Sequence, residues 1–134
     1  KSRRRNNMNR LFGYSINIAQ KSLDYLWKKQ SVITDNIANQ DTPGYKSRYV
    51  TFEDELRSNL AKASQTDEKD YVKAVENTDF RINTTENESA RMDGNNVNPD
   101  AEYVELARTT IQYQYAIRAV SDEFARLRSA IKGQ

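Results

Sequence analysis

The chain has 134 residues, of which 37% are hydrophobic and 30% are charged, so the core that it can bury is small. It contains no cysteine and no histidine, which excludes thiolate nucleophiles, disulfides, imidazole bases and the usual transition-metal ligands. The formal net charge of +2 depends on four cations among the first five residues, and without them the balance is slightly acidic. The composition therefore disfavours a nucleic-acid partner.

Residues 1–7 form a basic start that we interpret as a flexible arm or an expression remnant ahead of a native start at Met8. No apolar segment follows it to make a cleavable secretory signal, and no apolar run reaches the length that a membrane span needs. We therefore expect that any export of this chain uses another route.

Residues 8–40 are dominated by a heptad pattern that predicts a long helix from about residue 9 to residue 37 or 39. Apolar residues recur in alternating steps of four and three, which keeps them on one face of the helix. This row consists of Phe12, Ile16, Ala19, Leu23, Leu26, Gln30, Ile33 and Ile37.

A second row on the same helix repeats every seven residues, through Leu11, Ile18, Tyr25 and Val32. It lies about 130° from the first row on a helical wheel, so one partner helix cannot cover both. An exposed apolar row of this kind predicts an interaction surface. The alternative is that the middle of the chain covers it, but that segment has few apolar residues.

Residues 41–98 form a polar middle segment, expected to be irregular with a small β component. Its Thr42-Pro43-Gly44 step predicts a type II turn with Gly44 at the position that needs positive φ. We expect a short amphipathic helix over residues 51–63, a polar loop over 64–70 and a hairpin of strands 71–75 and 80–83. Residues 84–98 carry few apolar side chains, so we expect them to be mobile until something packs against them.

Residues 99–134 predict a second long helix, with Asn98 as its cap and Pro99 at its first position. Its main row comprises Tyr103, Leu106, Thr110, Tyr113, Ile117, Val120, Phe124, Leu127 and Ile131, whereas Val104, Ile111 and Tyr115 lie off that row.

These elements predict a mainly α, elongated fold in which the two long helices pair as an antiparallel coiled coil. The expected seam joins Phe12, Ile16, Leu23, Leu26, Ile33 and Ile37 to Tyr113, Ile117, Val120, Phe124 and Leu127. For a helical hairpin with a single seam, the free energy gained by burying apolar side chains is about equal to the free energy lost by ordering the chain. Contacts with neighbouring subunits must therefore supply the remaining stabilisation. The candidate subunit contacts are Leu11, Ile18, Tyr25, Val32, Val104, Ile111 and Tyr115.

The run from Asp35 to Lys46, Asp-Asn-Ile-Ala-Asn-Gln-Asp-Thr-Pro-Gly-Tyr-Lys, closely resembles the N-terminal signature of the bacterial flagellar rod and hook axial proteins. The run Asp-Gly-Asn-Asn-Val at residues 93–97 and the closing residues 123–131 extend this resemblance. The short middle segment resembles the proximal rod members of the family. The turn residues of the signature are Asn36, Ala38, Asn39, Thr42, Pro43, Gly44 and Tyr45.

The resemblance implies a structural subunit of the proximal rod in the basal body, which forms the drive shaft that transmits torque. Its implied partners are copies of itself, other rod proteins, the rod adapter FliE at the membrane-ring end and the flagellar type III export apparatus. Export would proceed without a cleaved signal peptide, and Phe12 and Ile16 match the Phe-x-x-x-hydrophobic element of the family's export signals. No cofactor, metal or small-molecule substrate is implied.

Two other classes of function remain to be weighed. An enzyme needs a constellation of reactive groups, whereas the acidic groups at residues 53–55, 86 and 88 are explained more simply as solvated faces and loops. The stronger alternative is a generic helical scaffold or adaptor of a secretion or appendage system that is not a rod subunit.

Overall fold

The computed structural model describes residues 2–63, 68–86 and 91–133. Within these ranges the chain is mainly helical, with four helices and one two-stranded antiparallel sheet. The elements are α1 (Ser2–Ala38), β1 (Arg48–Thr51), α2 (Glu53–Ala63), α3 (Glu68–Glu76), β2 (Arg81–Thr84) and α4 (Pro99–Lys132). The predicted mainly α class with a small β component is therefore confirmed.

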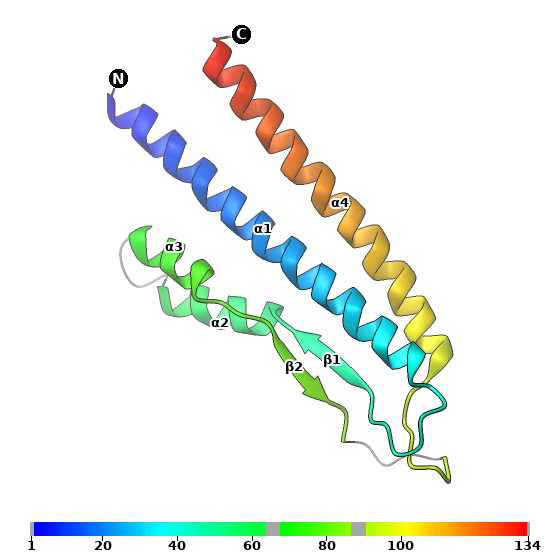
Figure 1. The fold of residues 1–134 in the computed structure, drawn as a ribbon. Coiled ribbons are helices and arrows are strands. Elements are labelled where there is room, and N and C mark those ends of the chain that lie inside the picture. The colour runs from blue at the N-terminus through cyan, green and yellow to red at the C-terminus, as the bar shows by residue number, and fades with distance from the viewer. Residues whose placement is uncertain (1, 64–67, 87–90, 134) are drawn as a thin grey trace.

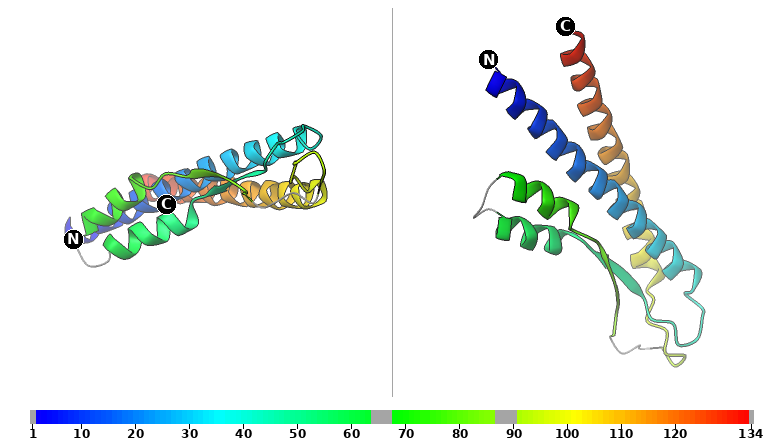
Figure 2. Two further views of the ribbon diagram at one scale, coloured as in Figure 1. Left: turned by 90° about the horizontal axis from the view of Figure 1, so that it is seen from below. Right: turned by 60° about the vertical axis from the view of Figure 1, so that its left-hand side comes forward.

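The two long helices α1 and α4 lie side by side and run in opposite directions (Figure 1). The start of α1 and the end of α4 lie at one end of the molecule, and the connections from α1 to β1 and into α4 lie at the other. The two helices separate toward the termini (Figure 2). The shorter elements lie along α1, so the molecule is elongated.

Helix α1 begins earlier than its heptad pattern predicts. It starts at Ser2, so the basic residues that we expected to form a separate arm continue the backbone of the helix. It ends at Ala38, within the predicted limits, where the N–H of Asn39 donates to the carbonyl of Asp35. The Thr42-Pro43-Gly44 turn follows at once and directs the chain back along α1.

Helix α4 begins where local chemistry predicts and is capped at both ends. The Asn98 side chain accepts a hydrogen bond from the N–H of Ala101, and Pro99 occupies the first turn, where no N–H is needed. Gly133 caps the other end at φ 71°, and its N–H donates to the carbonyl of Ser129. The helix thus starts at the predicted residue, Pro99, and ends at Lys132.

The middle segment differs from prediction in its pairing. The expected strand 71–75 is wrong, because these residues lie in α3, and Glu68–Glu76 also includes the last part of the expected loop 64–70. Residues 64–67 lie outside the described chain. The predicted strand at 80–83 corresponds to β2, but its partner is β1, with Arg48 opposite Thr84 and Thr51 opposite Arg81. The helix predicted at 51–63 is α2, starting at Glu53.

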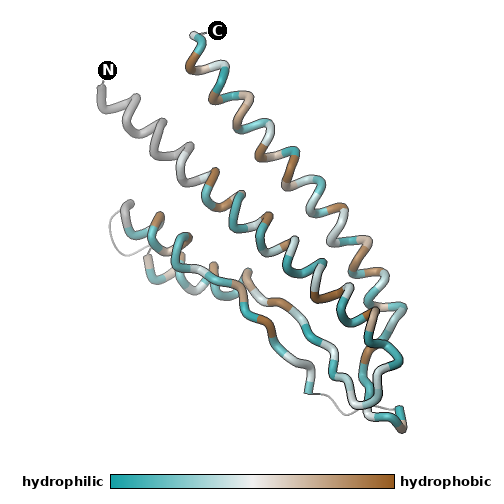
Figure 3. Tube along the Cα trace, in the orientation of Figure 1, coloured by the Kyte–Doolittle hydropathy of each residue, from teal (hydrophilic) through white to brown (hydrophobic). Residues whose placement is uncertain are grey.

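The main hydrophobic core lies around the C-terminal half of α1. Its buried members are Tyr25, Leu26, Val32, Val50 and Phe52, with Leu56, Tyr113 and Ala116 packed against them. The rings of Tyr25 and Phe52 stack with centroids 5.2 Å apart. This core joins α1 to β1 and α2 on one side and to α4 on another. Figure 3 shows apolar positions recurring along both long helices between hydrophilic ones.

Membrane crossing requires a helix that is both long and uniformly apolar, and none of the helices in the described ranges meets that requirement.

Candidate functional site

Asn36, near the end of α1, joins three elements at the turn end of the molecule. Its side chain is 1% exposed, and its amide nitrogen donates to the carbonyl of Arg48 at 2.8 Å and to Oε1 of Glu102 at 3.1 Å. Its amide oxygen accepts from the N–H of Arg48 at 2.9 Å and from the hydroxyl of Tyr45 at 3.2 Å. This one side chain therefore fixes the end of α1 against β1 and the start of α4.

Asn95 forms a second buried amide contact at the same end. It is 0% exposed, and its nitrogen donates to the carbonyls of Asn39 at 2.9 Å and Thr42 at 2.8 Å. Its oxygen accepts from the N–H of Val97 at 2.8 Å. The segment that precedes α4 thus satisfies backbone carbonyls that α1 and the turn leave without helical partners.

The turn itself has the predicted geometry. Gly44 has φ 71°, and the N–H of Tyr45 donates to the carbonyl of Thr42, as a type II turn requires. The N–H of Gly44 donates to the carbonyl of Asp93 at 2.7 Å, and Gly94, at φ 76°, lies close enough that a Cβ there would be 3.7 Å from the Gly44 Cα. The turn and the 93–96 segment therefore lie directly against each other.

Asn96 extends this contact to the sheet. Its oxygen accepts from the N–H of Ser47 at 2.6 Å, and its nitrogen donates to the carbonyl of Thr85 at 3.0 Å. Asn95 and Asn96 are not among the residues predicted to form the site, although both belong to the Asp-Gly-Asn-Asn-Val run. Because Asn95 and Val97 are buried, this part of the predicted mobile segment packs within the subunit itself. Of the signature residues, Ala38, Thr42, Pro43 and Gly44 are exposed, whereas Asn36, Asn39 and Tyr45 are at least partly buried.

The expected seam between α1 and α4 is packed unevenly. Leu26 and Ile33 are buried, whereas Ile117 is 43% exposed and Phe124 is 50% exposed because the helices separate toward the termini. The half-buried members are Ile16, Leu23, Ile37, Tyr113, Val120 and Leu127. The side chain of Phe12 lies outside the described residues.

The second row of α1 is not a free surface along its whole length. Tyr25 is 9% exposed and Val32 is 2% exposed, because Val50 and Phe52 of the middle segment pack on them. The expectation that this row faces a neighbouring subunit is therefore wrong at Tyr25 and Val32, which belong to the buried core of the subunit itself. Ile18 is half-buried, and the side chain of Leu11 lies outside the described residues.

The exposed apolar residues instead gather on α4. Val104 is 61% exposed, Ile111 is 55% exposed and Tyr115 is 68% exposed, and their spacing places all three on one side of the helix. We call these three residues the α4 outer row. Burial of such side chains by a partner is favourable, so this row is the best candidate for a contact between subunits.

A cleft of about 440 Å³ lies between α1, β1 and α4, near Asn36. Its lining consists of Lys29, Val32, Ile33, Arg48, Tyr49, Val50, Ala101, Glu102 and Glu105. Lys29 forms an ion pair with Glu105, and Arg48 forms one with Asp35 at 3.0 Å. Burial raises the pKa of Glu102 and the charge of Glu105 adds to this, while the hydrogen bond from Asn36 lowers it.

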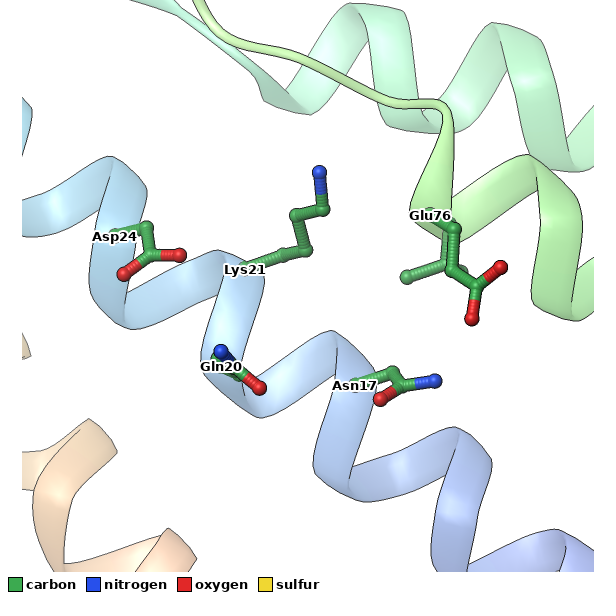
Figure 4. A pocket seen from close by; sticks show the side chains of 6 residues that line it. Asn17, Gln20, Lys21, Asp24 and Glu76 are labelled. Carbon is green, nitrogen blue, oxygen red and sulfur yellow. The ribbon is translucent and has the colours of Figure 1, made fainter.

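A smaller cleft of about 190 Å³ lies between α1 and α3 (Figure 4). Asn17, Gln20, Lys21 and Asp24 line it from α1, and Glu76 lines it from α3. The Lys21 ammonium donates to the carbonyl of Thr78 at 3.1 Å. This side of α1 therefore holds the middle segment in place by a polar contact. Across the described residues, no group of three or more acidic side chains is arranged to hold a metal ion.

Comparison with known proteins gives the family. Residues 16–46, which contain the whole signature run 35–46, match the family described as flagella basal body rod protein. The chain is 34% identical to the flagellar basal body rod protein FlgB of Bacillus subtilis (strain 168), over 92% of this chain and 97% of that protein. It is 30% identical to FlgB of Buchnera aphidicola subsp. Acyrthosiphon pisum (strain APS), over 96% and 98%. The chain therefore belongs to the FlgB family of flagellar basal body rod proteins.

Proposed function

We propose that this protein is a structural subunit of the proximal rod of the bacterial flagellar basal body. In this role it assembles with copies of itself and with other rod proteins into the helical drive shaft that transmits torque. Membership of the FlgB family and the nearly full-length match to its relatives support the assignment. The protein acts through its surfaces, as a structural component rather than an enzyme.

The structural observation that carries this proposal is the α4 outer row. Val104, Ile111 and Tyr115 are each more than half exposed, on a helix whose opposite face packs on α1. A neighbouring subunit that covers them gains roughly 1–3 kcal/mol for each well-buried side chain. A contact made by one face of an elongated subunit with a different face of the next generates a helical assembly when the rotation between subunits does not close into a ring.

The terminal helices have a second part in this proposal. We infer that α1 and α4 tighten into an antiparallel coiled coil in the assembled rod, along the seam expected from the heptads. The exposure of Ile117 and Phe124 in the isolated subunit supports this, because both belong to the heptad row and gain burial if the helices close.

The flagellar resemblance also supports the export route and the remaining partners. We propose that the chain crosses the cytoplasmic membrane through the flagellar type III export apparatus without a cleaved signal peptide, with Phe12 and Ile16 as part of the export signal. It then contacts the rod adapter FliE at the membrane-ring end. Membership of the FlgB family favours this reading over a generic scaffold.

The deciding experiment measures incorporation into the basal body. A strain that carries an epitope-tagged copy of this chain as its sole source is expected to be motile and to contain the chain in purified basal bodies. The Val104→Ser, Ile111→Ser double variant is expected to be exported but to leave few rods, whereas a Gln112→Ser, Gln114→Ser control on the same helix assembles normally. Absence of the wild-type chain from basal bodies would refute the proposal.

A further inference from the structure

Two aromatic residues are exposed on the face of the α1 and α4 pair that lies opposite the ion pair between Lys29 and Glu105. Trp27 stands two residues before Lys29, and Tyr103 stands two residues before Glu105. Two residues correspond to about 160° round a helix, so both aromatic side chains point to the face away from the ion pair. Trp27 is 62% exposed and Tyr103 is 53% exposed. We call Trp27 and Tyr103 the aromatic face.

The aromatic face lies where the two long helices are in contact, so its exposure does not come from their separation. Leu26, next to Trp27, is 8% exposed, and Tyr113 and Ala116 of α4 pack on the core that contains it. A large ring left in water beside a closed core gains free energy when a partner covers it. Tryptophan and tyrosine are also the residue types that contribute most to binding in protein interfaces.

Asp24 adds a negative charge beside the aromatic face. It lies three residues before Trp27, about 60° round α1 from it, and is exposed. Within the described ranges no lysine or arginine forms an ion pair with Asp24, including Lys28 on the next turn, and the Lys21 ammonium pairs instead with Asp79. The Asp24 carboxylate can therefore pair with a cation of another chain.

Arg118 adds a positive charge to the α4 outer row. It follows Ile111 by seven residues and Tyr115 by three, so it lies on the same side of α4, and it is exposed. In the part of the chain that the structure describes, no carboxylate forms an ion pair with Arg118, including Asp122 one turn further along the helix. The outer row is thus followed by a cation, whereas the aromatic face is followed by an anion.

The two surfaces also match in order and spacing. Toward the end of the molecule that holds the two termini, Asp24 follows Trp27 and Arg118 follows Tyr115, each after three residues or about 4.5 Å. When two copies lie side by side in the same orientation, a contact of Tyr115 with Trp27 therefore also brings Arg118 beside Asp24. In the reverse orientation the two charges lie about 9 Å apart along the helices.

We propose that the aromatic face of one subunit receives the α4 outer row of a second copy of this chain, with Arg118 paired to Asp24. This inference rests on the proposed function, because it takes an assembly of copies as given, and it names the face that the outer row meets. Two different faces join, so each added copy leaves one of each kind free and the contact can repeat. The apolar side chains supply the burial, and the opposite charges set orientation and register.

The first test exchanges the two charges, with each variant as the only copy of the chain in its strain. Asp24→Arg and Arg118→Asp each bring like charges together, so each is expected to lower the yield of rod-bearing basal bodies by about fivefold. The double variant restores an opposite pair and is expected to return to within about twofold of the wild-type yield. Arg57→Asp, at an exposed position of α2 outside both surfaces, serves as the matched control and should keep the wild-type yield.

The second test identifies the neighbour of Trp27 directly. A copy in which a photo-crosslinking phenylalanine derivative replaces Trp27 is expressed together with a copy that carries Gln112→Ser, which changes the mass of the tryptic peptide 109–118. The expected product in purified basal bodies joins position 27 to the mass-marked peptide, which only a second copy can supply.

Either test can overturn the proposed contact. Wild-type yields in both single charge variants, or no recovery in the double variant, would do so. So would the absence of a crosslink, or a crosslink only to the same chain, to another segment or to a different rod protein. By contrast, failure of the rod assignment itself shows as absence of the wild-type chain from basal bodies.

Discussion

The side-chain amide of Asn36 pairs with the backbone of Arg48 on both its donor and its acceptor side, as a neighbouring strand would. An amide side chain thus substitutes for a third strand along the edge of β1. It does so from the last turns of α1, while also donating to Glu102 of α4. The orientation of three elements therefore depends on one buried polar group.

Replacing this group should be costly for the isolated protein. Asn36→Ala leaves the N–H and the carbonyl of Arg48 without this partner in a largely buried place, so we expect the free energy of unfolding to fall by about 2–4 kcal/mol. Urea denaturation followed by circular dichroism measures the change. Gln112→Ala, at an exposed position of α4, serves as a control and is expected to have little effect. Equal stability of the two variants would show that the Asn36 contacts are dispensable.

The turn glycine gives a prediction based on backbone conformation alone. Gly44 has φ 71° and open space around a built Cβ, so Gly44→Val is expected to cost about 1–3 kcal/mol through strain rather than through a clash. Gly44→Asn, which tolerates this conformation better, should cost less. Gly13→Ala, inside α1 and also in open space, is expected to stabilise by up to about 1 kcal/mol. Thermal melts of the three variants should follow this order.

The contrast between covered and exposed apolar residues can be measured on the purified subunit. Val32→Ala removes contacts from the core and is expected to cost about 2 kcal/mol, whereas Ile111→Ala on the α4 outer row should change stability by less than about 0.5 kcal/mol. Chemical denaturation of both variants checks this. A large loss for Ile111→Ala would mean that the outer row is covered within the subunit.

The raised pKa of Glu102 predicts a pH-dependent difference between Glu102→Gln and wild type. Above the folded-state pKa, which lies above the usual value of 4.5, the wild type carries a charged, partly buried carboxylate, so the variant should be more stable. As the pH falls through that pKa the carboxyl becomes neutral, and the difference should vanish below about pH 4. Melting temperatures across this range test the sign, and an advantage that grows with acid would contradict it.

The sequence predicts those elements whose ends are set by residues only a few positions away. The ends of the long helices follow from Asn98, Pro99 and the Thr42-Pro43-Gly44 turn, each of which acts within a few residues. The strand at 71–75 was predicted wrongly because Tyr71, Val72 and Val75 fit a short helix and a short strand equally well. Neighbouring structure decides between them, and Val75 is buried as a residue of α3.

Contacts between distant segments are harder to predict. The strand β1 is recognisable only from its pairing with β2, because Arg48–Thr51 contains little apolar alternation of its own. The partners of Asn36, Asn95 and Asn96 lie up to 66 residues away, and no spacing along the chain indicates which carbonyl an amide will meet. The burial of Tyr25 and Val32 likewise depends on where the turn places Phe52.

Helices α1 and α4 are held together at the turn end and separate toward the termini. A small change in the angle of a helix at the turn end therefore produces a large displacement of its far end. Helix α4 has 34 residues, so at about 1.5 Å per residue it is about 50 Å long. A tilt of about 5° at the turn end therefore displaces the far end of α4 by about 4 Å, roughly the thickness of one side-chain layer. The hydrogen bonds of a few buried asparagines at the turn end thus set the direction of the long helices, and with it the position of the helix ends on the far side of the molecule.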